Sequence, residues 1–135
     1  MATSTSDTTP NTIVLIHGFW VTPRAWDDWK KRFEAKGYTV LAPAYPGFEV
    51  EVEALRADPT PIERLEVPEI IDMLENMIGK LDRPPIIMGH SAGGAFTQIL
   101  LDLQMPRTAI RKLISDNAAQ FLNLAVSEKA AQDAA

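Results

Sequence analysis

Residues 84–93 read PPIIMGHSAG, and this stretch decides the fold. Residues 84–89 predict a third buried strand, and an apolar stripe with helical spacing follows at Ala95, Phe96, Ile99, Leu100 and Leu103. Between strand and helix lies Gly89-x-Ser91-x-Gly93, in which two glycines permit a sharp turn that pushes the serine side chain out above the sheet. The sequence therefore predicts that Ser91 is an exposed nucleophile at a helix N-terminus.

The residues before this turn alternate between short apolar runs and amphipathic runs, which indicates a βαβα order. Strands are predicted at 12–17 and 38–43, and helices at 23–36 and 68–80. The first run is β-branched and apolar on both faces, as expected of a strand buried between two helix layers. Right-handed crossovers then predict a three-layer αβα sandwich with a short, mainly parallel sheet of three strands in the order 2-1-3.

The remaining segments are predicted to frame a single small domain. Prolines and a glycine at 43–61 predict a connection without regular elements, and a capping box is expected at 60–63. Residues 1–11 are expected to form a flexible tail, and residues 12–135 one domain with its core in 12–104. Apolar residues recurring at three and four predict a C-terminal amphipathic helix at about 107–131.

Composition excludes several classes of function. The formal net charge of −5 is spread along the chain, so no nucleic-acid partner is expected. The absence of cysteine excludes disulfides and thiolate chemistry, and a cytoplasmic location is the default expectation. No apolar run reaches membrane-spanning length. Two histidines in separate motifs, without clustered carboxylates, do not predict a metal site, and no cofactor is implied.

A second motif is predicted to meet the serine turn. His17-Gly18-Phe19-Trp20 ends the first strand, which should lie beside the third. The backbone N–H groups of Phe19 and Ala92 would then form an oxyanion hole, assisted by the positive end of the helix dipole. Gly18 and Trp20 are the expected substrate-binding residues beside it.

With both motifs in place, residues from Ile13 to Leu103 resemble the N-terminal half of a bacterial α/β-hydrolase of the esterase, lipase and haloperoxidase type. The resemblance implies that Ser91 is the nucleophile and that Phe19 and Ala92 supply the oxyanion hole. The family order is serine, acid, then histidine, whereas no histidine follows His90 in this sequence. The chain is therefore expected to be a truncated hydrolase with an incomplete or atypical triad.

Two histidines are candidates for the base that activates the serine. His17 is the tentative base because imidazole has a suitable pKa, although its usual role in the family is to brace neighbouring loops. His90 is the weaker candidate because its side chain should leave the turn in a different direction from Ser91. Carboxylates after the serine could orient a base, but each also fits a solvated helix face; they are Asp102, Asp116, Glu128 and Asp133.

The sequence is compatible with two functions. The first is weak hydrolysis of small carboxylic esters by Ser91. The second is a non-catalytic fragment that binds a hydrophobic ligand or a protein, in which the turn survives as scaffold. The third predicted strand lacks a further neighbour, and the tail carries an apolar stripe, so we also expect a homodimer that covers these surfaces.

Overall fold

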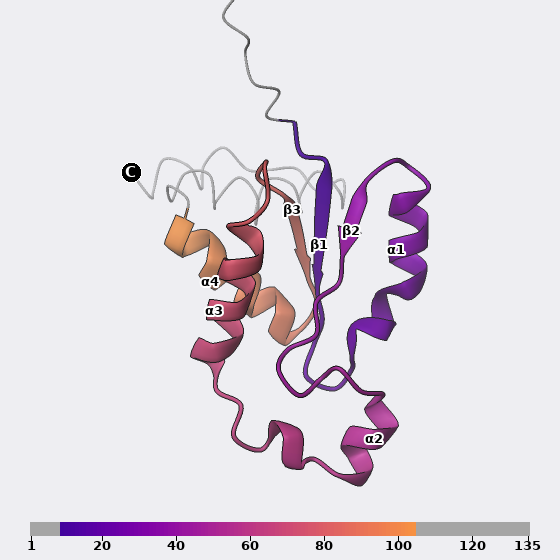
Figure 1. The fold of residues 1–135 in the computed structure, drawn as a ribbon, viewed down its shortest axis with the longest axis vertical. Coiled ribbons are helices and arrows are strands. Elements are labelled where there is room, and N and C mark those ends of the chain that lie inside the picture. Colours follow the sequence, from indigo (N-terminus) through magenta and orange to yellow (C-terminus); the bar gives the residue numbers. More distant parts are fainter. Residues whose placement is uncertain (1–8, 105–135) are drawn as a thin grey trace, which may run out of the picture. The chain divides into compact units, whose positions relative to one another are not determined.

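The computed structural model describes residues 9–104 (Figure 1). The predicted C-terminal helix at 107–131 and most of the predicted tail lie outside the described residues. The elements follow each other in the order β1 (Thr12–Ile16), η1 (Pro23–Trp26), α1 (Asp27–Glu34), β2 (Thr39–Leu41), α2 (Val52–Ala57), η2 (Thr60–Ile62), α3 (Val67–Ile78), β3 (Ile86–Gly89) and α4 (Ala92–Gln104), where η marks a 3-10 helix.

The sheet has three parallel strands in the order β2-β1-β3, as predicted. Thr12 pairs with Thr39 at the start of β1, and Ile16 pairs with Gly89 at its end. All five residues of β1 are buried, because a central parallel strand has helices on both faces. This register brings the carboxyl ends of β1 and β3 to the same edge of the sheet.

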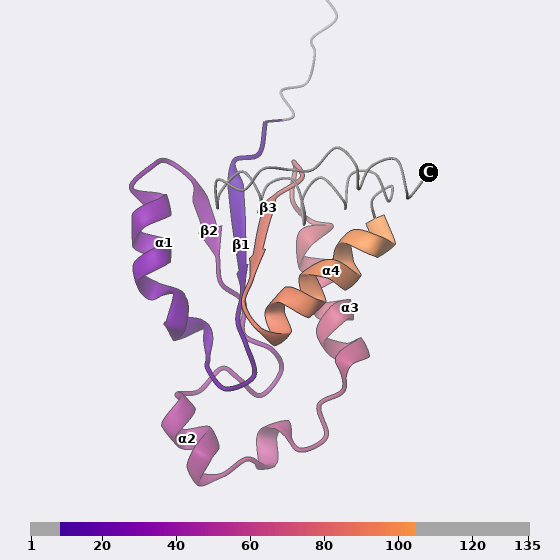
Figure 2. The same ribbon diagram turned by 180° about the vertical axis from the view of Figure 1, so that it is seen from behind.

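Alternate residues of β1 supply two separate cores. Ile13 and Leu15 pack with Val40 on the face covered by α1. The side chains of Val14 and Ile16 point to the opposite face, where the core also includes residues of α3 and α4, namely Ile70, Ile71, Leu74, Ile78, Phe96 and Leu100. Figure 2 shows the two helices α3 and α4 together on one side of the sheet and α1 on the other. The predicted three-layer αβα arrangement is confirmed.

Most predicted elements are present but shorter than predicted. The prolines Pro43, Pro84 and Pro85 provide no backbone N–H, so β2 and β3 exclude them. The helix predicted at 23–36 begins as the 3-10 turn η1 before it becomes α1. Thr22 occupies the N-cap position of η1, but its side chain makes no capping hydrogen bond.

Two predictions for the connection after β2 are wrong. The segment contains α2 and η2, although no regular element was predicted there; α2 fits between the prolines and buries Leu55. The capping box lies at Glu66 and Glu69 rather than at 60–63. The Thr60 side chain instead donates to the carboxylate of Asp58, which also accepts from the Thr60 N–H.

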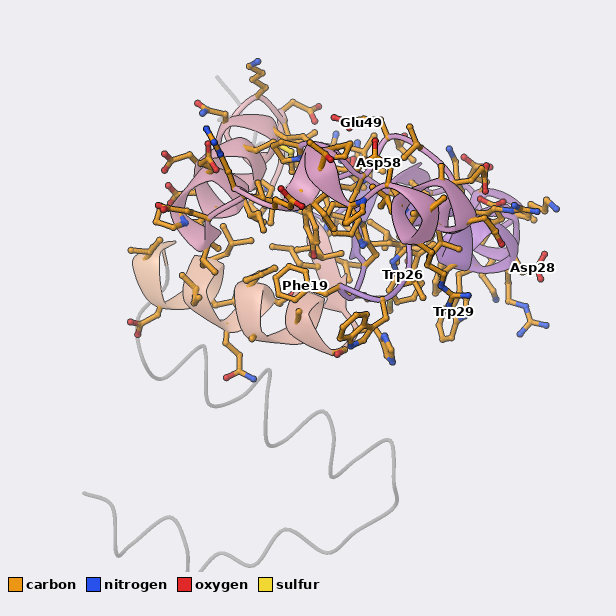
Figure 3. All side chains as sticks on the ribbon, turned by 90° about the horizontal axis from the view of Figure 1, so that it is seen from below. Phe19, Trp26, Asp28, Trp29, Glu49 and Asp58 are labelled. Atoms are coloured by element: carbon orange, nitrogen blue, oxygen red, sulfur yellow. The ribbon has the colours of Figure 1, made fainter. Side chains whose placement is uncertain are left out.

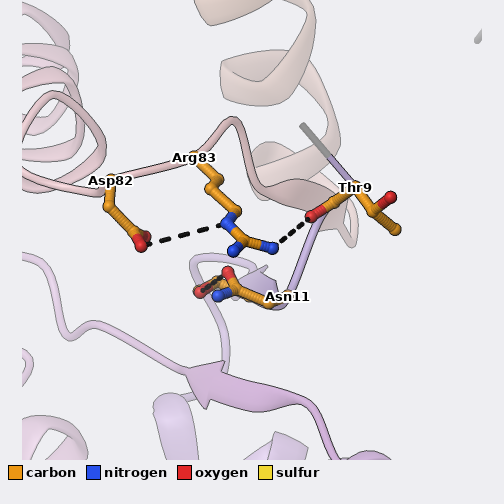
Figure 4. A network of polar contacts seen from close by, with 5 residues as sticks. Thr9, Asn11, Asp82 and Arg83 are labelled. Carbon is orange, nitrogen blue, oxygen red and sulfur yellow. Dashed lines mark hydrogen bonds and ion pairs between the residues drawn. The ribbon is translucent and has the colours of Figure 1, made fainter. Parts of the chain in front are cut away.

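Polar contacts tie the start of β1 to the turn before β3 (Figure 4). An Nη1 group of Arg83 donates to the carbonyl of Thr9 at 3.4 Å, and Asp82 lies 4.0 Å from the Arg83 Nε. Asn11 accepts a hydrogen bond from the Thr12 hydroxyl at 3.1 Å. These contacts lie at the amino ends of the strands, opposite the edge that carries Ser91. Within residues 9–104, no helix has both the length and the apolar character needed to cross a membrane.

The buried face of α3 gives a test of the fold. Leu74 is fully buried in the core beneath α3, whereas Asn76 on the same helix is exposed. Leu74→Ala should lower the free energy of unfolding by about 2–5 kcal/mol, because it removes apolar contacts and leaves a cavity. Asn76→Ala should change it by less than about 0.5 kcal/mol. Urea unfolding checks both values, and equal midpoints for the two variants would contradict the described packing.

Candidate active site

The candidate site is built on the turn between β3 and α4. Ser91 has a φ of 56°, and it is the single non-glycine residue with positive φ among the described residues. This left-handed conformation costs about 1–3 kcal/mol for a residue with a side chain, so the surrounding packing must impose it. Ser91 is exposed. The strand before it was predicted to be buried, but residues 86–88 are only partly buried and Gly89 is exposed, because β3 is the outer strand of the described sheet. The sharp strand-to-helix turn predicted at Ser91 is therefore present.

Two glycines make the tight turn possible through close backbone approach. A Cβ atom on Gly93 would lie 2.2 Å from the carbonyl oxygen of Ile16, and one on Gly89 would lie 2.2 Å from the carbonyl oxygen of Gly93. Neither position has room for any side chain. The Thr97 hydroxyl donates to the Gly93 carbonyl at 2.8 Å, which fixes the first turn of α4.

The end of β1 lies directly against the elbow. The His90 N–H donates to the Ile16 carbonyl at 3.1 Å, which continues the ladder between β1 and β3 into the turn. A Cβ on Gly18 would be 3.2 Å from the Cβ of Ser91. The two motifs named from the sequence are therefore in contact, as the strand order predicted.

Two backbone N–H groups are available beside Ser91. Ala92 is the first residue of α4, where N–H groups have no acceptor within the helix. Phe19 follows Gly18, which packs against Ser91. Neither the Ala92 N–H nor the Phe19 N–H has an acceptor in the part of the chain that the structure describes. Such unpaired donors, together with the helix dipole, are suited to a developing negative charge.

His17 is buried and shielded from solvent. Its Nδ1 lies 2.8 Å from the Gly18 carbonyl, so this nitrogen carries the proton and donates. The ring packs on Tyr45 at a centroid distance of 4.0 Å and on Phe48 at 5.2 Å. Burial lowers the pKa of His17 below its ordinary value, while hydrogen bonds to the backbone oppose the shift. The buried Nε2 makes no hydrogen bond of ordinary length within residues 9–104, although the backbone of Val21 also interacts with the ring and raises its pKa.

His90 has a different environment. Its side chain is exposed, and its Nδ1 would lie 3.5 Å from a Cβ on Gly18, the same position that Ser91 approaches. His90 therefore borders the junction of the two motifs. Asp102 is exposed on α4, and the other candidate carboxylates, Asp116, Glu128 and Asp133, lie outside the described residues. No group of three potential metal ligands occurs in residues 9–104.

Aromatic side chains form one wall beside Ser91. Phe19 makes edge contacts with Phe96 at 5.6 Å and with Tyr45 at 6.2 Å between ring centroids, yet it remains 42% exposed. Figure 3 shows Phe19 beside α4, away from the tryptophans of η1 and α1. Trp20 is 86% exposed and projects into solvent, so the structure does not place it in a pocket.

Tyr45 is a supporting residue whose role the sequence did not reveal. Its hydroxyl donates to the His17 carbonyl and its ring touches Phe19, so it joins the connection after β2 to both parts of the His17–Trp20 motif. Burial raises the pKa of the Tyr45 hydroxyl, which keeps its proton for this bond. The only sequence signal was an aromatic residue shortly after the end of the second strand.

Comparison with known proteins agrees with this geometry. The model of the alpha/beta hydrolase family matches residues 13–127. An extracellular α/β-hydrolase from a Paenibacillus species is 28% identical, with a TM-score of 0.57 over 70% of this chain and 36% of that chain. That protein is described as sharing structural and functional homology with tobacco salicylic acid binding protein 2.

Two structures of the pyrethroid hydrolase PytH are also similar. Each is 24% identical, with a TM-score of 0.56 over 71% of this chain and 36% of that chain. At this identity the likeness shows the fold alone. The chain covers little more than a third of the length of the protein in each of the three structures. No curated protein matches the sequence.

Neighbouring glycines offer a matched test of the elbow. A Cβ on Gly93 meets backbone oxygen at 2.2 Å, whereas the nearest atom to a Cβ on Gly94 is 3.5 Å away. Gly93→Ala should lower the free energy of unfolding by about 2–3 kcal/mol or more, because backbone must move. Gly94→Ala should raise it by roughly 0.5–1 kcal/mol through helix propensity. Chemical denaturation measures both, and similar effects of the two variants would refute the close approach.

The burial of His17 predicts a pH dependence of stability. In the unfolded chain this imidazole binds a proton near its ordinary pKa of 6.5, whereas the folded chain binds it only at lower pH. The unfolded state thus holds more protons just below pH 6.5. The stability due to neutral His17 is complete above that pH and is lost as the pH falls toward the folded pKa.

Urea unfolding at a series of pH values measures this effect. His17→Phe should remove the loss of stability between about pH 6.5 and 5, while His90→Gln should retain it because His90 is exposed. A wild-type protein with constant stability across this interval would contradict a buried, neutral His17.

Proposed function

Because the chain belongs to the alpha/beta hydrolase family, we propose that it is a serine hydrolase of carboxylic esters with Ser91 as the nucleophile. The observation that carries the proposal is the conformation of Ser91, which has a φ of 56° and lies in contact range of Gly18. The positive φ of this serine lowers the stability of the fold, so it needs a functional reason. A serine at a helix N-terminus, beside a second loop whose N–H groups have no acceptor among the described residues, is suited to acyl transfer. The Paenibacillus hydrolase, at 28% identity, supports the reaction class.

The proposed reaction proceeds in two halves. The Ser91 Oγ attacks the ester carbonyl carbon while its proton passes to a base, and the N–H groups of Phe19 and Ala92 stabilise the resulting oxyanion. Collapse of this intermediate breaks the bond to the alcohol, which leaves with the proton. Water then attacks the acyl-serine, and the carboxylic acid departs as Ser91 regains its proton.

The base is proposed from the two histidines. His17 is neutral, as a base must be, but its ring is fully buried and also interacts with the backbone of Val21. His90 is exposed and borders the junction of Gly18 and Ser91. We retain His17 as the first candidate and His90 as the second.

The expected rate follows from the groups proposed for the site. Oxyanion stabilisation and binding alone give about a thousand- to ten-thousand-fold acceleration over water. Aryl esters have good leaving groups and need little help from a general acid, so they are the substrates on which such activity is measurable. The exposed, edge-packed ring of Phe19 offers an apolar surface for a small acyl group, and the exposed Trp20 indole is proposed to contact the same substrate.

Hydrolysis of p-nitrophenyl acetate tests the proposal. The wild type should show a burst followed by turnover, and Ser91→Ala should lower the rate to that of buffer, because the acyl acceptor is removed. Ser4→Ala, which removes a hydroxyl from the N-terminal tail, is the control and should retain the wild-type rate. If wild type and Ser91→Ala are equal, the esterase proposal is wrong, and binding of a hydrophobic ligand becomes the function to test.

A further inference from the structure

The helix layer formed by η1 and α1 packs Trp26 and Phe33 on the core but leaves the large side chain of Trp29 in contact with solvent. Trp29 is 50% exposed, and neither η1 nor α1 contains a buried residue. By contrast, α3 on the other face of the sheet buries Ile70, Ile71, Leu74 and Ile78. Large aromatic groups exposed in this way mark surfaces that a partner covers.

The exposed indole of Trp29 is held in place by its neighbours. Its ring lies 5.9 Å from that of Trp26 at an interplanar angle of 89°, and 5.9 Å from that of Phe33. Figure 3 shows Trp26 and Trp29 beside each other, with Asp28 at the outer end of the group. A side chain that is already ordered loses little conformational entropy on binding, which favours a role as an anchor in an interface.

Charged groups surround this anchor. Asp28, Trp29 and Arg32 line a concavity of about 360 Å³. The Asp28 side chain is 98% exposed and is paired only with Lys31, at 3.7 Å. Arg32 is exposed and forms no ion pair with any residue in the described part of the chain. Along α1, the Trp29 indole thus lies between the exposed Asp28 carboxylate and the Arg32 guanidinium, which has no ion-pair partner among the described residues.

The spacing of these charges makes the surface complementary to itself. Asp28 and Arg32 are separated by one helical turn, or about 6 Å along the helix axis. When two copies of α1 pack antiparallel about a two-fold axis near residue 30, the Asp28 carboxylate of each copy lies opposite the Arg32 guanidinium of the other. The two Trp29 rings then meet close to the axis, where interface residues contribute most to binding.

We propose that Asp28, Trp29 and Arg32 form the interface of a symmetric homodimer of this chain. The proposal identifies the surface on α1, rather than the outer edge of β3, as the one that a second copy covers. It does not depend on the proposed esterase activity, because none of these three residues belongs to the candidate active site.

Charge reversal tests the pairing directly. Asp28→Arg leaves two cations on the surface and Arg32→Asp leaves two anions, so each variant alone should repel its own copy and raise the dissociation constant about tenfold or more. An equimolar mixture of the two variants has complementary charges at every contact and should recover the dimer. Light scattering over about 1–100 μM measures the mass, since dimerisation depends on concentration.

Removal of an exposed tryptophan supplies the matched control. Trp29→Ala should dissociate the dimer, whereas Trp20→Ala, which removes the more exposed indole at the other motif, should leave it intact. A wild type that remains monomeric throughout, or a dimer that survives both charge reversals, would overturn the proposal. A monomer in which acrylamide fails to quench the fluorescence of Trp29 would also overturn the proposal. In that case another part of the same chain, or another protein, covers Trp29.

Discussion

The close approach of two backbones at Gly93 is the constraint on which the site depends. Because Gly93 has no side chain, the first turn of α4 can rest on the carbonyl oxygen of Ile16 at the end of β1. This contact holds Ser91 at positive φ and brings Gly18 against it. The strain at Ser91 is about 1–3 kcal/mol, which the apolar packing of β1, α3 and the start of α4 offsets.

The elbow and the sheet could be predicted from sequence because their signals are local and strong. An apolar run, two glycines and a helical stripe define β3, Ser91 and α4, and the handedness of crossovers gives the strand order. The contact between Gly18 and Ser91 follows from that order alone. The contact between the His17–Trp20 segment and the turn at Ser91 could therefore be predicted from the sequence alone.

Other features depend on contacts between side chains and distant parts of the chain, which local sequence patterns do not reveal. The six-residue helix α2 buries only Leu55, so it has no periodicity to detect. The capping box stands at Glu66 because α3 begins at Val67, and the Thr60 hydroxyl donates to Asp58 instead of capping a helix. Tyr45 was missed as a brace because its bond to the His17 carbonyl joins residues 28 positions apart. Of these contacts, only that of Tyr45 reaches the candidate site.

We propose that the turn at Ser91 makes this serine a reactive nucleophile. Intact-mass analysis after treatment with a serine-directed fluorophosphonate measures this most directly, because the probe reacts in proportion to nucleophile and oxyanion activation. We expect one adduct per chain. It should lie in the tryptic peptide of residues 81–107, whose only serine is Ser91. A protein that stays unmodified, or an adduct on any other residue, would contradict it.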